Sequence, residues 1–68
     1  MNEDTLNMAV RKFLKHVGIS SQREIENAIF KAVENGDLKG DESLNVDMTL
    51  SMPALGINHK IEGEISLD

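Results

Sequence analysis

Residues 20–36 read SSQREIENAIFKAVENG, and this stretch decides the fold. It predicts an amphipathic helix whose two ends are both marked in the sequence. Ser21 is followed three residues later by Glu24, which is the pattern of a capping box, and Ser20 is an alternative cap. Gly36 can take the left-handed backbone conformation that ends many helices. The apolar residues between these ends recur at helical spacing and form one stripe, made up of Ile25, Ala28, Ile29, Ala32 and Val33.

A first helix is predicted upstream of this one. Asn2 or Asp4 caps its start, and Gly18 ends it. Its apolar stripe consists of Leu6, Val10, Phe13, Leu14 and Val17. Ile19 then lies in a short link, where it packs near Ile25 as a hydrophobic staple. Because the link is short, the two helices form a helical hairpin or a helix-turn-helix crossing.

The period of the apolar residues changes from helical to two after Ser43. Apolar and polar residues alternate from Leu44 to Met52 and again from Ile57 to Leu67, which predicts two half-buried strands. Pro53 cannot donate to a ladder and therefore ends the first strand. The strands form an antiparallel hairpin, whose register stays open. A turn at Pro53 and Ala54 pairs Met52 with Leu55, whereas a four-residue loop pairs Met52 with Ile57.

Together these elements predict a single small α+β domain over residues 1–68. Its elements come in the order helix, helix, strand, strand, and the two helices pack on one side of the hairpin. A two-stranded hairpin is weak by itself, so it needs the helices or a second subunit to cover it. The chain has no cysteine, and therefore no disulfide stabilises the domain.

The formal net charge of −5 is placed entirely in the C-terminal half of the chain. Residues 1–35 carry five basic and five acidic side chains, whereas residues 36–68 carry two basic and seven acidic ones. An acidic hairpin repels nucleic acid and anionic lipid, so nucleic-acid binding is not expected. Residues 1–15 lack the apolar core of a signal peptide, and no apolar run is long enough to span a membrane. We therefore expect a cytoplasmic protein that does not bind membranes.

Several short segments carry a resemblance to known proteins: Asn7–Met8, Arg11–Lys15, Val17–Gly18, Ser21–Glu26, Met48–Leu50 and Gly63–Ile65. Through them nearly the whole chain resembles a family of short bacterial proteins of unknown function. The resemblance implies a bacterial origin and a small domain that stands alone. It brings no activity and no site residues.

The segment Ser21–Leu38 is also similar to the recognition helix of winged helix-turn-helix domains and to the turn that leads into their wing. This second resemblance implies a nucleic-acid-binding protein, which is the alternative reading. Gln22 and Arg23 can face a groove, but Glu26 and Glu34 share their helix. The alternative therefore ranks below a module that binds proteins.

No catalytic, cofactor-binding or metal-binding residue is predicted. His16 and His59 lack the spacing of metal ligands, and no serine lies in a nucleophile motif. Two features instead favour contacts with a partner. Phe30 lies off the apolar stripe of its helix, and a basic cluster occupies the first helix at Arg11, Lys12 and Lys15. The sequence thus predicts a non-catalytic interaction module that binds a protein partner or associates with itself.

Overall fold

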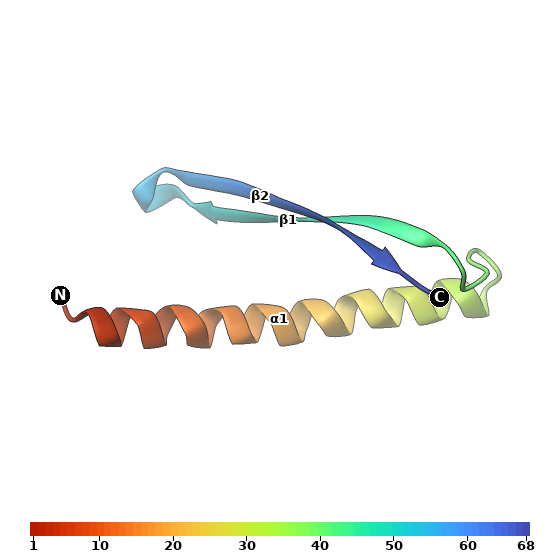
Figure 1. Ribbon diagram of the computed structural model, residues 1–68, viewed down its shortest axis with the longest axis horizontal. Coiled ribbons are helices and arrows are strands. Elements are labelled where there is room, and N and C mark those ends of the chain that lie inside the picture. Colours follow the sequence, from red (N-terminus) through yellow and green to blue (C-terminus); the bar gives the residue numbers. More distant parts are fainter. The chain divides into compact units, whose positions relative to one another are not determined.

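A computed structural model describes all 68 residues of the chain (Figure 1). The chain divides into two compact units, Met1–Asp37 and Leu38–Asp68. The elements are, in order, the helix α1 (Glu3–Glu34), the strand β1 (Ser43–Met52), the 3₁₀ turn η1 (Pro53–Leu55) and the strand β2 (Ile57–Ser66). One helix followed by an antiparallel hairpin confirms the predicted α+β class.

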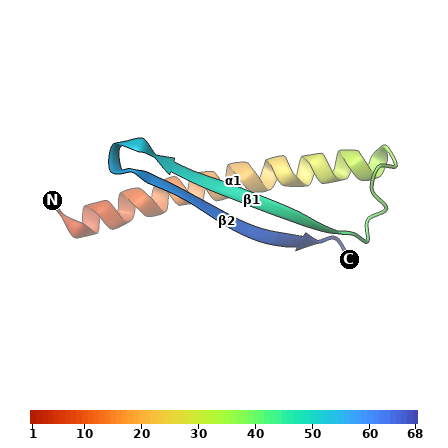
Figure 2. The same ribbon diagram turned by 90° about the horizontal axis from the view of Figure 1, so that it is seen from above.

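The first unit contains one uninterrupted helix of 32 residues, so the prediction of two helices was wrong (Figures 1 and 2). Gly18 lies inside α1, and its φ angle is not positive, unlike that of a glycine that ends a helix. A glycine inside a helix costs about 1 kcal/mol relative to alanine. Ending one helix and starting another costs more, because it leaves up to eight backbone groups without partners inside the helix. The helix therefore continues through Gly18, Ser20 and Ser21, and no helix-turn-helix crossing forms.

The start of α1 agrees with one of the two predicted caps. The side chain of Asn2 accepts a hydrogen bond from the backbone N–H of Thr5 at 3.0 Å. Glu3 and Asp4 occupy the first turn, where negative charge interacts favourably with the positive end of the helix dipole. Asn2 is thus the cap.

The end of α1 confirms the role predicted for Gly36, whose φ angle is 81°. Its backbone N–H donates to the carbonyl oxygen of Val33 at 3.1 Å. The next N–H, that of Asp37, donates to the carbonyl oxygen of Ala32 at 2.8 Å. These two bonds form a Schellman motif, in which the left-handed glycine lets the chain reverse and satisfy the last carbonyls.

The second unit is a two-stranded antiparallel ribbon, whose register settles the choice between the two predicted turns. Met52 pairs with Ile57, so the four-residue loop forms. The first strand ends before Pro53, as predicted. Gly56 completes the loop with a φ of 67°, and its N–H donates to the carbonyl oxygen of Pro53 at 3.1 Å.

The register places apolar residues opposite one another along the ribbon. On one face the cross-strand pairs are Leu44 with Ile65, Val46 with Gly63, Met48 with Ile61, Leu50 with His59 and Met52 with Ile57. The alternate pairs are polar and lie on the other face, because successive side chains of a strand point to opposite sides. We call the first of these faces the apolar face of the ribbon. It confirms the predicted alternation.

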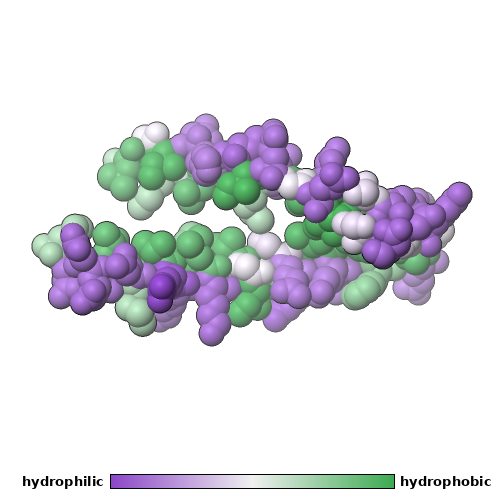
Figure 3. Space-filling view, in the orientation of Figure 1, coloured by the Kyte–Doolittle hydropathy of each residue, from purple (hydrophilic) through white to green (hydrophobic).

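No side chain of the chain is fully buried. One helix, or one ribbon of two strands, has no second layer to enclose a core. Figure 3 shows the consequence: hydrophobic and hydrophilic residues are segregated along each unit, and the hydrophobic ones remain at the surface. The helix is not long and apolar enough at any point to cross a membrane.

Candidate interaction surfaces

The continuity of α1 joins the two predicted apolar stripes into one long surface. We call it the main stripe, and it consists of Leu6, Val10, Phe13, Leu14, Val17, Ile25, Ala28, Ile29, Ala32 and Val33. Each half is amphipathic, in the manner of a helix that packs against another layer. The centre of the stripe turns by about 80° around the helix between the two halves, from Val17 to Ile25. The main stripe is the larger of two apolar surfaces on α1.

The second apolar surface of α1 is a line of three side chains, Met8, Ile19 and Phe30, which we call the eleven-residue line. Eleven residues make about three turns, so each member lies above the previous one with a drift of only about 20°. Their exposed fractions are 66%, 50% and 66%. On a helical wheel Ile19 lies about 160° from Val17, at the centre of the first half of the main stripe. In the first half of α1 the line therefore lies on the side opposite the main stripe. In the second half Phe30 lies about 60° from Val33, beside the edge of that stripe.

The sequence did not identify Ile19 as part of a surface, because it assigned this residue to a link between two helices. Phe30 was recognised as a residue that lies off the stripe of its helix. The three residues of the line share an equal spacing of eleven residues. This spacing aligns their side chains only if one continuous helix carries all three.

The structure brings together some of the predicted partner-binding residues and separates others. Arg11, Lys12 and Lys15 lie within about one turn of α1 and border a shallow depression beside Met8. Phe30 lies fifteen residues beyond Lys15 on the same helix. At a rise of 1.5 Å per residue this is about 22 Å, so Phe30 and the basic cluster form no common site. They lie instead near opposite ends of the eleven-residue line.

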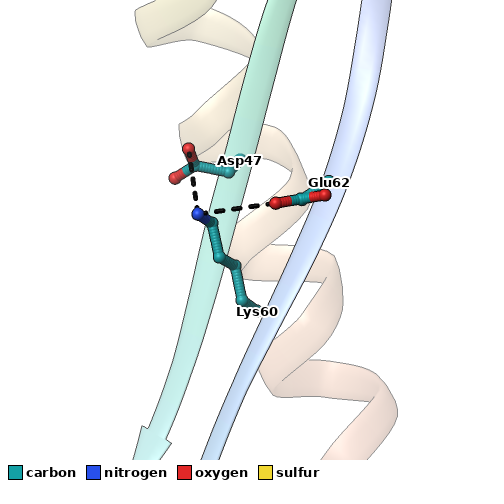
Figure 4. A network of polar contacts seen from close by, with 3 residues as sticks. All are labelled: Asp47, Lys60 and Glu62. Carbon is teal, nitrogen blue, oxygen red and sulfur yellow. Dashed lines mark ion pairs between the residues drawn. The ribbon is translucent and has the colours of Figure 1, made fainter.

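The polar face of the ribbon carries a small charge network (Figure 4). Asp47 and Glu62 lie directly opposite each other, and like charges in this arrangement repel. The Nζ atom of Lys60 lies between them, 3.5 Å from Glu62 Oε1 and 4.0 Å from Asp47 Oδ2. All three side chains are exposed, so each ion pair contributes at most about 1 kcal/mol. Lys60 thus reduces the repulsion between Asp47 and Glu62, and the polar face of the ribbon remains acidic.

Glu42 organises the loop that leads into β1. Its carboxylate accepts backbone N–H bonds from Lys39 at 2.8 Å, Gly40 at 2.9 Å and Asp41 at 3.2 Å. The bonds from Lys39 and then Gly40 are the main reason that the pKa of Glu42 is lower than its ordinary value. The charged carboxylate is thus a structural part of the loop.

This loop should loosen in acid. Because the folded-state pKa of Glu42 is depressed, its contribution to stability is complete above the unfolded-state pKa. That contribution is lost as the pH falls through the folded-state pKa. In an NMR titration we expect a lower midpoint for Glu42 in the native chain than in the same chain unfolded in urea. The amide protons of Lys39 and Gly40 should lose protection in parallel. Equal midpoints in the two states would show that the three bonds do not hold in solution.

No group of three or more histidine, aspartate or glutamate side chains lies close enough together to hold a metal ion. The acidic depression on the ribbon is shallow and is lined by residues such as Asp47, Glu62 and Gly63. What the structure does present is apolar surface on α1 and on the ribbon, and such surface is suited to contact with other protein chains.

The comparisons with known proteins agree with the resemblance noted in the sequence. A model of one protein family matches residues 1–68, and the family is described as a family of unknown function (DUF6494). No curated protein and no solved structure matches the chain.

Proposed function

We propose that this chain, which belongs to the family of unknown function DUF6494, is a non-catalytic module that binds protein chains through its apolar surfaces. The observation that carries the proposal is the absence of any buried side chain together with fourteen large hydrophobic residues that are exposed. Exposed apolar surface of this extent marks sites of association in soluble proteins.

Nucleic-acid binding is the weaker alternative. Its structural basis was the helix-turn-helix crossing, which the continuous helix α1 replaces. The ribbon that would act as a wing presents Asp47, Glu62 and Glu64 with one lysine among them.

The predicted cytoplasmic location and bacterial origin remain predictions.

We expect no binding to random duplex DNA tighter than about 10⁻⁵ M at physiological salt, since nonspecific affinity depends on positive charge. Fluorescence polarisation with a labelled duplex measures this directly. The control is a variant with charge reversal at Arg11, Lys12 and Lys15, which should give the same weak signal. Tight, steeply salt-dependent binding that this variant loses would restore the alternative.

The proposed function is tested by following the helical circular dichroism and the sedimentation of the purified chain as it is diluted. We expect cooperative unfolding only where the chain is associated, because neither unit encloses a core by itself. A monomer that lacks cooperative unfolding at every concentration would also support the proposal, since the chain would then require a different protein partner. A monomer that unfolds cooperatively and independently of concentration would overturn it.

A further inference from the structure

We propose that the outer edge of β2 pairs with the same edge of a second copy of the chain. The two β2 strands run antiparallel, and the twofold axis passes through Ile61, so that two ribbons of two strands form one sheet. This inference rests on the proposed function and names its partner. The outer edges of a ribbon carry backbone groups that another strand can bind. Because a sheet with a hydrophobic face needs three or more strands to be stable alone, the pairing supplies what one ribbon lacks.

The hydrogen bonds of the ribbon determine which backbone groups of β2 lie at its outer edge. The N–H of Leu67 donates to the carbonyl oxygen of Glu42 at 2.9 Å, and this bond continues the register of the ribbon by one pair. Hydrogen-bonded and non-hydrogen-bonded pairs alternate along an antiparallel ladder. The apolar pairs are therefore the hydrogen-bonded ones. The polar residues of β2 point their N–H and C=O groups away from β1, and they are Asn58, Lys60, Glu62, Glu64 and Ser66.

The apolar residues of β2 are arranged symmetrically about Ile61. Ile57 and Ile65 lie four residues before and after it. When a second β2 is turned around at Ile61, the two copies of Ile61 face each other, and each Ile57 faces Ile65 of the second copy. Ile61 is 55% exposed in the ribbon, so much of its apolar surface is available for this contact. Such cross-strand pairs stabilise a sheet, and β-branched residues pack well on its pleated surface.

The polar residues between these isoleucines are complementary in the same alignment. Lys60 comes directly opposite Glu62 of the second copy, and the symmetry makes this contact twice. Asn58 comes opposite Glu64 of the second copy, also twice. Opposite charges that face each other across two strands stabilise a sheet. Because the outward backbone groups of these residues also face each other, about eight backbone hydrogen bonds join the two copies.

The other charges near the contact balance one another. At the diagonal positions, about 7–8 Å away, each Lys60 approaches Glu64 of the second copy. These two attractive contacts offset two repulsive ones, which join the two copies of Lys60 and the two copies of Glu62. The remaining acidic residue of the strands, Asp47, lies on β1, with Lys60 of its own ribbon 4.0 Å away. The direct pairs of Lys60 with Glu62 therefore determine the sign of the interaction.

Neighbouring alignments and the other edge are less favourable. An axis at Glu62 would place Glu62 opposite itself and Ile61 opposite Gly63, and an axis at Lys60 would place Lys60 opposite itself. The edge of β1 carries a single charged residue, Asp47, so it offers no pair of opposite charges. A contact between β1 and β2 of different copies would repeat into an open filament, whereas the twofold pair of β2 edges closes.

The first test exchanges the charges in the full chain and measures the dissociation constant of the dimer by sedimentation equilibrium. Lys60→Glu and Glu62→Lys each place like charges opposite one another twice. Each variant alone should raise the constant about tenfold or more. An equimolar mixture of the two variants restores opposite charges at both contacts and should return the constant to within about threefold of the wild type. Only contacts between chains can produce this rescue.

The matched control is Lys39→Glu, which changes the net charge as Lys60→Glu does but lies in the loop before β1. It should change the dissociation constant less than about twofold. A rise as large as that of Lys60→Glu, or a mixture without rescue, would overturn the inference while the wild type associates, and the proposed function would survive. A monomeric wild type would also overturn the inference. If that monomer unfolds cooperatively, the proposed function is overturned as well.

The second test locates the axis with introduced cysteines. Facing Cα atoms of a non-hydrogen-bonded pair lie about 4.5 Å apart, which suits a disulfide, and the two copies of Ile61 form such a pair. The chain has no cysteine of its own, so an introduced cysteine reports on one position alone. Met48 is the matched control position, because it lies opposite Ile61 on β1 and on the same face of the ribbon.

We expect Ile61→Cys to form a covalent dimer in a glutathione buffer, seen as a band of twice the mass on a non-reducing gel. Met48→Cys should stay monomeric, because its two copies lie three strand spacings apart in the proposed sheet, about 14 Å. Dimers of Met48→Cys would mean that the apolar faces or the β1 edges meet, and they would overturn the inference. The absence of dimers of Ile61→Cys at a concentration where the chain associates would overturn it too.

Discussion

Gly18→Pro should lower the free energy of unfolding by about 3 kcal/mol or more. Proline at this position removes the N–H that donates to the carbonyl of Leu14 within α1, and its ring clashes with that carbonyl. The loss is a large part of the stability of a small protein, which lies at about 5–15 kcal/mol in total. Urea unfolding followed by the helical signal at the same chain concentration measures the change.

Gly18→Ala is the matched variant, and its effect should have the opposite sign. A Cβ at Gly18 meets no atom within 4 Å, and the backbone there is helical. Alanine should therefore raise the free energy of unfolding by about 1 kcal/mol. If alanine were destabilising and proline harmless, Gly18 would end a helix in solution, as the sequence first indicated.

Ile29→Asp should cost about 2–4 kcal/mol of the stability of the associated chain, because the main stripe is one of the apolar surfaces through which we propose that the chain binds other chains. The substitution removes apolar area from that contact and places a carboxylate in it. Ile29 is half-buried and lies near the middle of the second half of that stripe. Circular dichroism in a urea titration, at a chain concentration where the wild type is fully associated, gives the difference in stability.

The control for this substitution lies two residues away. Asn27→Asp introduces the same charge on the same helix, about 160° around from Ile29 and at an exposed position. We expect it to change the stability by less than about 0.5 kcal/mol. The same large loss in both variants would mean that charge, and not the covering of the main stripe, controls stability.

The sequence predicted the ends of the structure's elements better than their number. Asn2 caps the start of α1 and Gly36 terminates it, as expected, because a cap depends on one residue and its nearest backbone groups. The strands and the end of β1 at Pro53 also follow from local chemistry, since proline cannot donate to the ladder. The choice between two registers of the ribbon required the structure, because the alternation permits both.

The error at Gly18 came from a competition between local and cooperative effects. Gly18 followed by Ser20 and Ser21 has the composition of a helix end and a new cap. Each of these residues, however, costs only about 0.5–1 kcal/mol inside a helix, whereas an interruption loses backbone hydrogen bonds on both sides. The candidate surface on α1 also differs from the predicted one, because one continuous helix replaces the two predicted helices. Phe30 was found from the sequence, whereas Ile19 was assigned to the link of a crossing that does not form.

The topology of the chain also has a consequence for how fast it assembles. Hydrogen bonds in α1 join residues four apart, and the longest pairing in the ribbon joins Ser43 with Ser66. Such local contacts form quickly, in about 0.1–1 μs for a helix and about 1–10 μs for a hairpin. Two proteins meet with rate constants of about 10⁵–10⁷ M⁻¹s⁻¹, which at micromolar concentration gives about 0.1–10 events per second. Where the chain associates as proposed, the slow step is therefore the encounter between chains, and the associated protein forms faster as the chain concentration rises.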